Sequence, residues 1–378
     1  MLTIKNGRII TNDGILDKKN IIIEDGKIKR ISDKVPQGSE VIDAQGNFVA
    51  PGFIDMHIHG ASNCDTMDGT YDSINTISKT IAKHGVTSFV PTTTTYDIGA
   101  IKKSIGAVRE CMKNKTDGAQ VLGVHLEGPY INEKVKGAQN GEYILKPGID
   151  SFLDMIGGDF NGIIRITLAP EIEGADELIK FLVGKGVIVS VGHSYGTYDQ
   201  IMHGIGMGIS HSTHLYNAMR GFAHREPGVV GAIFDSGITT EFICDGVHIH
   251  FAAIRTAIAV KGYQNCALIT DAMQACCMED GEFSLGGQKV IVKDGAARLD
   301  DGTLAGSTLT LDRAVRNILK NTDLGITEAI SMASSVPAKI IKVDDRKGYI
   351  KPGYDADIII LDSKINILKT IVGGKVIQ

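Results

Sequence analysis

Residues 51–60 of the chain read PGFIDMHIHG, a short apolar segment that ends in two histidines separated by one residue. A run of this kind predicts a buried strand. Alternate side chains of a strand share a face, so His57 and His59 would point the same way, about 6.5–7 Å apart along the chain. Two such imidazoles could bind one metal ion, although a His-x-His pair at a strand end is more often a hydrogen-bonded polar pair. Further ligands at other strand ends are needed to decide between these interpretations.

Apolar strand-like runs alternate with amphipathic helix-like stretches through the middle of the chain. The predicted strands are Phe53–His59, Thr87–Thr93, Gln120–Glu127, Ile163–Pro170, Val187–His193, Ile209–His214, Glu241–Asp245 and Ala267–Asp271. The predicted helices between them include Tyr71–His84, Asp97–Asn114, Asp176–Lys185, Tyr198–Met207 and Phe251–Lys261. Eight strands alternating with helices predict an α/β fold, a (β/α)8 TIM barrel, in which functional groups lie where the strands run into the βα loops.

The two ends of the chain have a different pattern, with short β segments separated by turn signals such as Asp13-Gly14 and Asp25-Gly26. We therefore predict that residues 1–50 and 345–378 form one small β-sandwich domain, beside a barrel that spans residues 51–344. Short strands and glycines near 281–306 predict a β-hairpin insertion after the eighth strand. The polar segment 130–148, which is long for a βα connection, is a candidate for covering a substrate.

Composition excludes several classes of function. The balance of 39 Lys and Arg against 44 Asp and Glu gives a net charge of −5, with no basic run that would follow a nucleic acid backbone. No apolar run approaches the roughly 18 residues that cross a membrane. The six cysteines show no Cys-x-x-Cys spacing, and the start MLTIKNGRII lacks the apolar core of a secretory signal. We therefore expect a reduced, cytoplasmic protein that binds neither nucleic acid nor membranes.

Five of the predicted strands end in residues that bind metals or carry a negative charge. They are His57 and His59 on the first strand, Glu127 on the third, His193 on the fifth, His214 on the sixth and Asp271 on the eighth. A barrel would bring all six to one rim, where imidazole and carboxylate ligands suit a metallohydrolase. Taken singly, each histidine is more often structural. Glu127 would be costly to bury without a cation, whereas His125 is expected on the opposite face in a structural role.

The motifs PGFIDMHIHG, HLEGPY, LAPE, VGHS, THLYNAM, HREPG, DGVH, TDA and LAGS follow one another across residues 51–307. In this order they resemble the N-acetylglucosamine-6-phosphate deacetylases of the amidohydrolase superfamily, and KPGYDADIIILD extends the resemblance over essentially the whole chain. The resemblance implies that Glu127, His193 and His214 bind a catalytic divalent metal and that Asp271 is the general base and acid. His57 and His59 match members that hold two ions, with Glu127 as the bridge. Zn and Fe accept such ligands equally well.

The resemblance also implies a phosphorylated amino sugar as the substrate, hydrolysis of its acetamide, and a homodimer. The residues at family positions that contact the sugar phosphate are Ala138, Gln139, Asn217, Ala218, Arg225, His248, Leu304, Ala305 and Gly306. Arg225 offers a planar fork of donors for a phosphate, although it could instead pair with Glu226 at the surface. Gln139 stands where the family often has histidine, and an amide can donate a hydrogen bond but cannot carry a proton.

Two other interpretations remain open. The chain could be another amidohydrolase, acting on a cyclic amide or an N-acyl amino acid. Such enzymes commonly use a carboxylated lysine at the fourth strand, where this chain has Leu168-Ala169-Pro170-Glu171. It could also be a non-catalytic scaffold that retains the barrel, but a scaffold would be expected to lose ligands, and all six are present.

Overall fold

The computed structural model describes residues 1–11 and 14–377, so the turn predicted at Asp13-Gly14 lies partly outside the described residues. Eight parallel strands form a nearly closed barrel. They are β6 (Phe53–Ile58), β9 (Val86–Thr93), β11 (Val124–Glu127), β12 (Ile163–Leu168), β13 (Ile188–Val191), β14 (His211–Ser212), β15 (Thr239–Ile243) and β16 (Cys266–Ile269). Each pairs with the next in chain order, and a parallel bridge between Ile58 and Ala272 brings the eighth strand back to the first.

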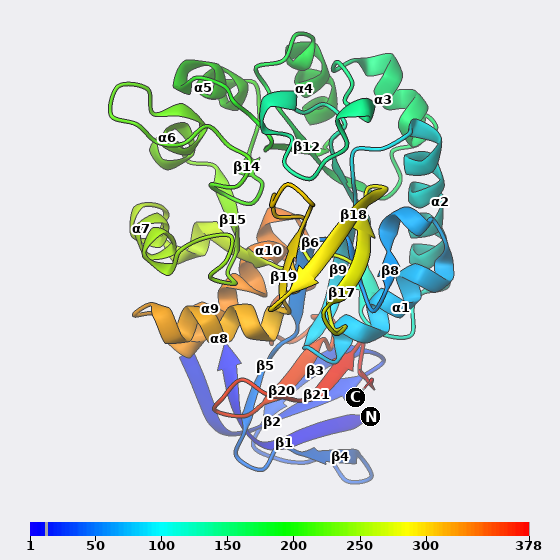
Figure 1. Ribbon diagram of the computed structural model, residues 1–378. Helices are drawn as coiled ribbons and strands as arrows, with labels where there is room; N and C mark the ends of the chain where they lie inside the picture. Colours follow the sequence, from blue (N-terminus) through cyan, green and yellow to red (C-terminus); the bar gives the residue numbers. More distant parts are fainter. Residues whose placement is uncertain (12–13, 378) are drawn as a thin grey trace.

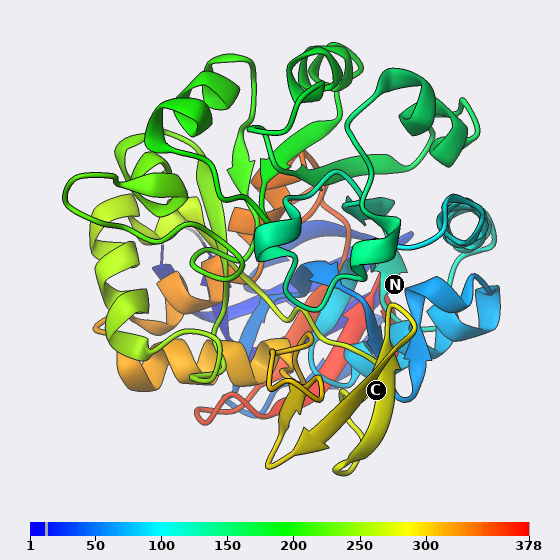
Figure 2. The same ribbon diagram turned by 45° about the horizontal axis from the view of Figure 1, so that its top comes forward.

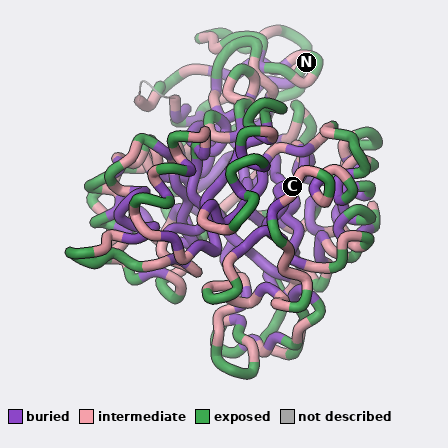
Figure 3. Tube along the Cα trace, turned by 90° about the horizontal axis from the view of Figure 1, so that it is seen from above, coloured by how far each residue is buried: buried purple, intermediate pink, exposed green. Residues whose placement is uncertain are grey.

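A helix follows each barrel strand. These are α1 (Tyr71–Ala82), α2 (Ile98–Asn114), α3 (Ile149–Ile156), α4 (Ala175–Gly184), α5 (Tyr198–Gly206), α6 (Gly228–Asp235), α7 (Phe251–Lys261) and α8 (Leu311–Asn321). They surround the strands in Figures 1 and 2. Buried segments concentrate inside the ring of helices, whereas exposed loops lie at its periphery (Figure 3). The predicted TIM barrel is confirmed. None of the helices in the described part is long and apolar enough to cross a membrane.

The third predicted strand is interrupted. A short strand, β10 (Gln120–Val121), pairs with β9 before β11 begins. Gly123 lies between the two with φ of 156°, and a Cβ at this position would lie 2.5 Å from the carbonyl oxygen of Gly162. Only glycine allows the chain to pass this close to the neighbouring strand.

Both ends of the chain join one eight-stranded sheet below the barrel, drawn in blue and red in Figure 1. Its strands are β1 (Leu2–Thr11), β2 (Gly14–Glu24), β3 (Lys27–Ser32), β4 (Glu40–Asp43), β5 (Phe48–Pro51), β20 (Ile358–Leu361), β21 (Ile367–Val372) and β22 (Lys375–Val376). The strands from the two ends of the chain are joined by the antiparallel pairing of β20 with β5. A second apolar core includes Val49 and Ile350 but no residue between them. We therefore propose the domain division at residues 50 and 345.

The insertion expected as a β-hairpin over 281–306 has three antiparallel strands, β17 (Gly281–Leu285), β18 (Gln288–Lys293) and β19 (Ala296–Arg298). It lies at the edge of the barrel opening in Figure 2. The loop after β11 contains the short helices η2 (Glu133–Val135) and η3 (Gly141–Tyr143). Gln288 of the insertion donates a hydrogen bond to the carbonyl of Ala138 at 2.5 Å, so the two segments meet over the barrel mouth.

The remaining elements are β7 (Gly60–Ala61), β8 (Cys64–Asp65), η1 (Thr66–Asp68), η4 (Tyr263–Asn265), α9 (Ile326–Met332) and α10 (Ser335–Ile340).

Candidate active site

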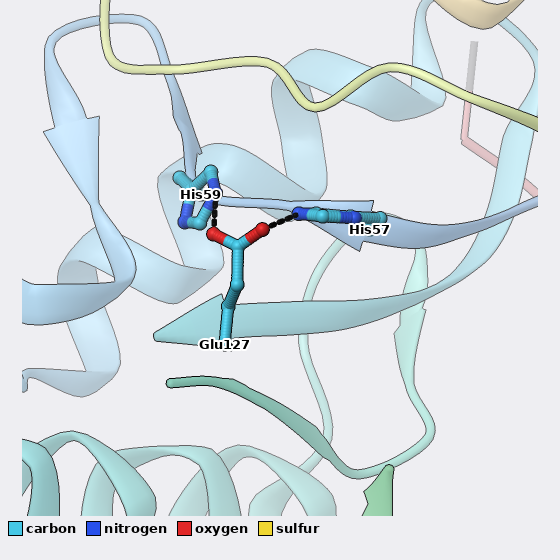
Figure 4. Close-up of side chains that lie close together, drawn as sticks. All are labelled: His57, His59 and Glu127. Carbon is cyan, nitrogen blue, oxygen red and sulfur yellow. Dashed lines mark ion pairs between the residues drawn. The ribbon is translucent and has the colours of Figure 1, made fainter. Parts of the chain in front are cut away.

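The six predicted ligand residues converge at the carboxyl ends of the barrel strands, with Glu127 at the centre. Its Oε1 atom lies 3.0 Å from Nε2 of His214, 3.3 Å from Nε2 of His193 and 3.4 Å from Nε2 of His57. Its Oε2 atom lies 3.3 Å from Nε2 of His59. Figure 4 shows His57 and His59 facing different oxygens of this carboxylate. One carboxylate thus joins four histidines from three strand ends.

Asp271 completes the cluster from the eighth strand. Its Oδ1 atom lies 3.1 Å from Nε2 of His59 and 3.5 Å from Nε2 of His57. The backbone of Asp271 is fixed from both sides, because its N–H donates to the carbonyl of His57 at 2.9 Å and its own carbonyl accepts from the N–H of Ser307 at 2.8 Å. The Asp271 side chain is therefore held next to the pair from β6.

Four of these residues lie one or two positions beyond the ends of their strands, because the strands are shorter than those predicted from the sequence. They are His59, His193, His214 and Asp271. Three have positive φ, at 46° for His193, 29° for His214 and 49° for Asp271. This region is sparsely populated by residues other than glycine, and its occurrence at a site indicates backbone held by surrounding contacts. The turn in the backbone redirects these side chains from the strand onto the barrel rim.

Neighbouring acceptors hold three of the imidazoles in one tautomer. Nδ1 of His57 lies 2.7 Å from Oε1 of Glu241, and Nδ1 of His59 and His193 lie 3.2 Å and 3.1 Å from the carbonyls of Thr92 and Val135. A proton on each Nδ1 leaves the Nε2 lone pair directed at the centre. Among the described residues, Nε2 of His57 has no hydrogen-bond partner. The lone pairs on these imidazole nitrogens are suited to binding a cation.

The charges at the centre also favour a cation. Burial by itself raises the pKa of Glu127, but His57 and the hydrogen bonds from His193, His214 and His59 outweigh it and lower that pKa well below its usual range. Asp271 behaves in the same way, because His57 and His59 lower its pKa more than burial raises it. Both carboxyl groups are therefore ionised in a buried site, where a cation would stabilise them.

A buried ion pair lies directly beneath the cluster, and sequence reasoning missed it. Glu241 on β15 accepts from Nη1 of Arg165 on β12 at 2.5 Å and lies 3.1 Å from Nε2 of His211. Burial raises the pKa of Glu241, but Arg165 and His57 lower it well below its usual range. The signal was available, since both Arg165 and Glu241 stood within apolar predicted strands, where a charged residue requires a partner.

His125 was predicted on the opposite face from Glu127, and this was wrong. Residues two apart in a strand share a face, so both point into the barrel, with His125 deeper. His125 lies 2.7 Å from the hydroxyl of Thr167, 3.2 Å from that of Thr92 and 2.9 Å from Nη2 of Arg165. Burial, followed by the charge of Arg165, lowers its pKa well below the usual value, so His125 is neutral.

A cavity of about 340 Å³ opens above the cluster. It brings together His59, Glu127, His193, His214 and Asp271 with the predicted substrate residues Ala138, Gln139, Asn217, Ala218, His248, Leu304 and Gly306. Ala305 is fully buried and Arg225 is exposed, and neither lines the cavity. Their roles in substrate binding stay predictions.

Gln139 is anchored between the loop and the cluster. Its Nε2 donates to Oε2 of Glu127 at 2.6 Å, and its Oε1 accepts from the N–H of Thr95 at 2.6 Å. The amide can therefore orient the central carboxylate without exchanging a proton.

The profile of the amidohydrolase family matches residues 48–377 of the chain. The chain belongs to the amidohydrolase family. It is 39% identical over 380 residues to the N-acetylglucosamine-6-phosphate deacetylase of Lysinibacillus sphaericus, a match that covers 99% of this chain and 97% of that protein. It is 37% identical over 369 residues to the N-acetylgalactosamine-6-phosphate deacetylase of Escherichia coli O157:H7, covering 97% of each.

A solved structure of similar fold is a mutant N-acetyl-D-glucosamine-6-phosphate deacetylase from Mycobacterium smegmatis, in complex with N-acetyl-D-glucosamine-6-phosphate. It has a TM-score of 0.90 and 28% identity, and the match covers all of this chain and 98% of that one. Within this amidohydrolase chain, two overlapping groups could each hold an ion, namely His57, His59 and Glu127, and Glu127, His193 and His214. Family membership and these groups together support a divalent metal.

Proposed function

We propose that this chain hydrolyses the acetamide of N-acetyl-D-glucosamine 6-phosphate to D-glucosamine 6-phosphate and acetate, a step of amino-sugar catabolism. The observation that carries the proposal is the complete six-residue cluster, five of whose members line the cavity, in a chain so similar along its length to such a deacetylase. A scaffold that had lost catalysis would have no need of this cluster, and the fourth strand ends without the lysine that cyclic amidases use.

We further propose two divalent ions, Zn or Fe, with His57 and His59 on one side, His193 and His214 on the other and Glu127 between them. Divalent ions bound to such ligands polarise a carbonyl and lower the pKa of water from about 15.7 toward 7. The overlap of the two candidate groups at Glu127 supports the bridging role. The buried ligands and their fixed tautomers mean that the site is formed before an ion arrives.

Asp271 is the residue that moves the proton. It lines the cavity and has its backbone fixed on both sides, so its carboxylate holds a constant position relative to the substrate. As general base it accepts a proton from the attacking water, and as general acid it then gives this proton to the amide nitrogen. The transfer is necessary because an amine anion is a very poor leaving group.

The cavity walls supply the sugar contacts. Asn217 offers an amide for sugar hydroxyls, and His248 is oriented by a 2.7 Å contact between its Nδ1 and Oδ2 of Asp245. Arg225, on the exposed segment after β14, would contact a phosphate that projects from the cavity mouth. The homodimer and the cytoplasmic location expected from the sequence stay predictions.

A second candidate substrate is N-acetyl-D-galactosamine 6-phosphate, which the similarity to the Escherichia coli O157:H7 relative favours. The two sugars differ only in the configuration at C4, and the reacting acetamide is the same. Comparison of kcat/KM for the two substrates decides which one this site prefers. A clear preference for the galactosamine compound would replace the glucosamine assignment while leaving the chemistry unchanged.

Acetate release is the direct test. Enzyme stripped with a chelator should release no acetate from N-acetylglucosamine 6-phosphate and should recover when Zn²⁺ or Fe²⁺ is added back. Asp271→Asn should keep its metal content and lose turnover by at least about 100-fold, the lower range for general acid–base catalysis. Asp280→Asn, an exposed carboxyl just before the insertion, is the matched control. An active Asp271→Asn variant would refute the proton-transfer role, and hydrolysis of a cyclic amide alone would refute the substrate.

A further inference from the structure

A second group of reactive side chains lies outside the cavity, at the junction of the loop after β16 with α1 and α8. Sγ of Cys277 lies 3.3 Å from Nε2 of His84, and Nδ1 of His84 lies 3.2 Å from Oδ1 of Asp312. The other oxygen of Asp312 accepts from Nη2 of Arg316 at 2.7 Å. A thiol, an imidazole and a carboxylate therefore form a chain of contacts, the arrangement by which proteins activate a sulfur nucleophile.

The four residues come from three separate parts of the sequence, and the fold brings them together. His84 follows α1, whereas Asp312 and Arg316 lie on α8. Both helices lie against the sheet built from the chain ends (Figure 1). Thr370 of that sheet donates to the carbonyl of Ala82 at 2.7 Å, which fixes the segment just before His84. The imidazole thus lies between Asp312 on one side and Cys277 on the other.

Cys277 is exposed, whereas the side chain of Asp312 is 8% exposed. Because Cys277 is exposed, a dissolved oxidant can reach its sulfur. The buried carboxylate of Asp312 contacts His84. The neighbouring Cys276 is buried, with its Sγ 3.8 Å from that of Cys277 and 3.4 Å from the carbonyl of Leu309. The charged groups that act on the two thiols are His84, Asp312, Arg313 and Asp55, and Arg316 contacts the carboxylate of Asp312.

The charges agree with this geometry. Hydrogen bonds from Cys276 and His84 lower the pKa of Cys277 to about 5, although burial opposes them. Burial alone lowers the pKa of His84, but Asp312 and Cys277 raise it to about 9. The pair is therefore a thiolate beside an imidazolium at neutral pH. Contact with Cys277, together with burial, raises the pKa of Cys276, which stays a thiol.

We propose that Cys277 is a site of oxidation by hydrogen peroxide, activated by His84 and Asp312 and separate from the deacetylase cavity. The sulfur attacks one peroxide oxygen, an S–O bond forms and the O–O bond breaks. The sulfur loses two electrons, and the leaving hydroxide takes the proton from Nε2 of His84 to become water. The product is a sulfenic acid on Cys277. Cys276 and Cys277 are neighbours in the chain, so their Cα atoms lie about 3.8 Å apart, which is below the usual range for a disulfide. A disulfide between them is therefore not the favoured product.

Alkylation by iodoacetamide at different pH values tests the activation. At pH 5.5 a thiol with a pKa of about 8.5 is about 0.1% ionised, whereas a pKa of about 5 leaves about three-quarters of it as thiolate. A thiolate of lower pKa is also a weaker nucleophile, which reduces the advantage of the larger thiolate fraction roughly 40-fold. We therefore expect Cys277 to react about 20-fold faster in the native metal-loaded protein than in urea at pH 5.5, and at similar rates at pH 7. Peptide mass spectrometry locates the label.

Two variants of the partner residues test the relay. His84→Asn should slow native alkylation of Cys277 at pH 5.5 by about 10-fold or more, and Asp312→Asn, should the first variant fail to fold, should slow it in the same direction. His203→Asn is the matched control, since His203 also pairs with a carboxylate, Asp176, at 2.9 Å but is exposed and has no cysteine beside it. If the rate of Cys277 alkylation depended on pH in the same way in the partner variants and in the control, activation of Cys277 by His84 and Asp312 would be overturned.

Peroxide treatment in the presence of dimedone, which traps sulfenic acids, tests the oxidation itself. We expect an adduct on Cys277 in the wild type, a weaker one in His84→Asn and none in Cys277→Ser. An adduct divided equally between Cys277 and the half-buried Cys64, or no adduct at all, would overturn the proposal. Neither result depends on the deacetylase assignment, because the measurement does not use turnover.

Discussion

The buried pair beneath the metal cluster makes Glu241→Gln the most informative substitution in the barrel. Oε1 of Glu241 lies 2.7 Å from Nδ1 of His57, and its Oε2 accepts from Arg165 at 2.5 Å. The side chains of Glu241 and Arg165 are at most 1% exposed. Glutamine keeps nearly the same volume, so the substitution changes charge and hydrogen bonding without opening a cavity.

Two separate losses follow from this change. Arg165 becomes a buried cation without its counter-ion, and breaking a buried pair by removing one partner costs about 3–5 kcal/mol of stability. His57 also loses the carboxylate that fixes its tautomer, and such partners of metal ligands are worth about 10- to 100-fold in metal affinity. That factor corresponds to about 1.4–2.7 kcal/mol of binding free energy.

The two losses can be measured separately. Urea denaturation of the metal-free protein gives the free energy of unfolding, and metal titration of the folded protein gives the affinity. Glu282→Gln is the control, because Glu282 pairs with Lys289 at 2.8 Å on the exposed insertion, where a pair contributes at most about 1 kcal/mol. Adding Arg165→Met to Glu241→Gln should recover part of the stability but not the metal affinity. A stability loss below about 1 kcal/mol with unchanged affinity would refute the reasoning.

Three further predictions concern other parts of the chain. Substituting His57 and His59 together by Asn should lower the bound metal from about two ions to one per chain in elemental analysis, and an unchanged ratio would contradict the two-ion proposal. Gln139→Leu removes the donor to the central carboxylate and should lower kcat/KM about 10-fold without unfolding the protein; full activity would count against the orienting role. Burial alone raises the pKa of Asp355, but Lys347 and Lys27 lower it overall, so its stabilisation is present above about pH 4 and is lost as the pH falls through the folded pKa. Asp355→Asn should therefore have a lower free energy of unfolding than the wild type at pH 7 in urea denaturation, and the difference should shrink as the pH falls below about 4; a difference that stays constant over this range would exclude the linkage.

The barrel and the rim positions of the candidate metal ligands could be predicted because they depend on local pattern. Apolar runs of five to eight residues mark parallel strands buried on both faces, and a histidine or carboxylate at the end of such a run has only the rim to occupy. The partners inside the barrel could not be predicted in this way. Glu241 and Arg165 lie 76 positions apart, and their contact depends on the register between strands three places apart in the barrel.

The backbone at the ligands was also beyond sequence reasoning, and it explains how the rim is held. Positive φ at His193, His214 and Asp271 costs roughly 1–3 kcal/mol per residue, so each must be compensated by surrounding contacts. The carbonyl of His193 accepts from the N–H of Asn132 at 2.9 Å, in the loop after β11. The N–H that follows His214 donates to the carbonyl of Glu241 at 3.0 Å, and Asp271 is bonded on both sides.

Each of these contacts joins the turn after one strand to a different strand or to the loop that follows it. Each strained turn is therefore held by at least one contact from outside its own loop. This arrangement predicts that loosening one turn weakens ligands on the neighbouring strands as well. Because the carbonyl of His193 is held by the loop that also carries Gln139, a change in that loop would reach both His193 and Glu127. The loop after β11 and the cluster around Glu127 are thus parts of one structural unit, although the six residues of the cluster come from five strand ends.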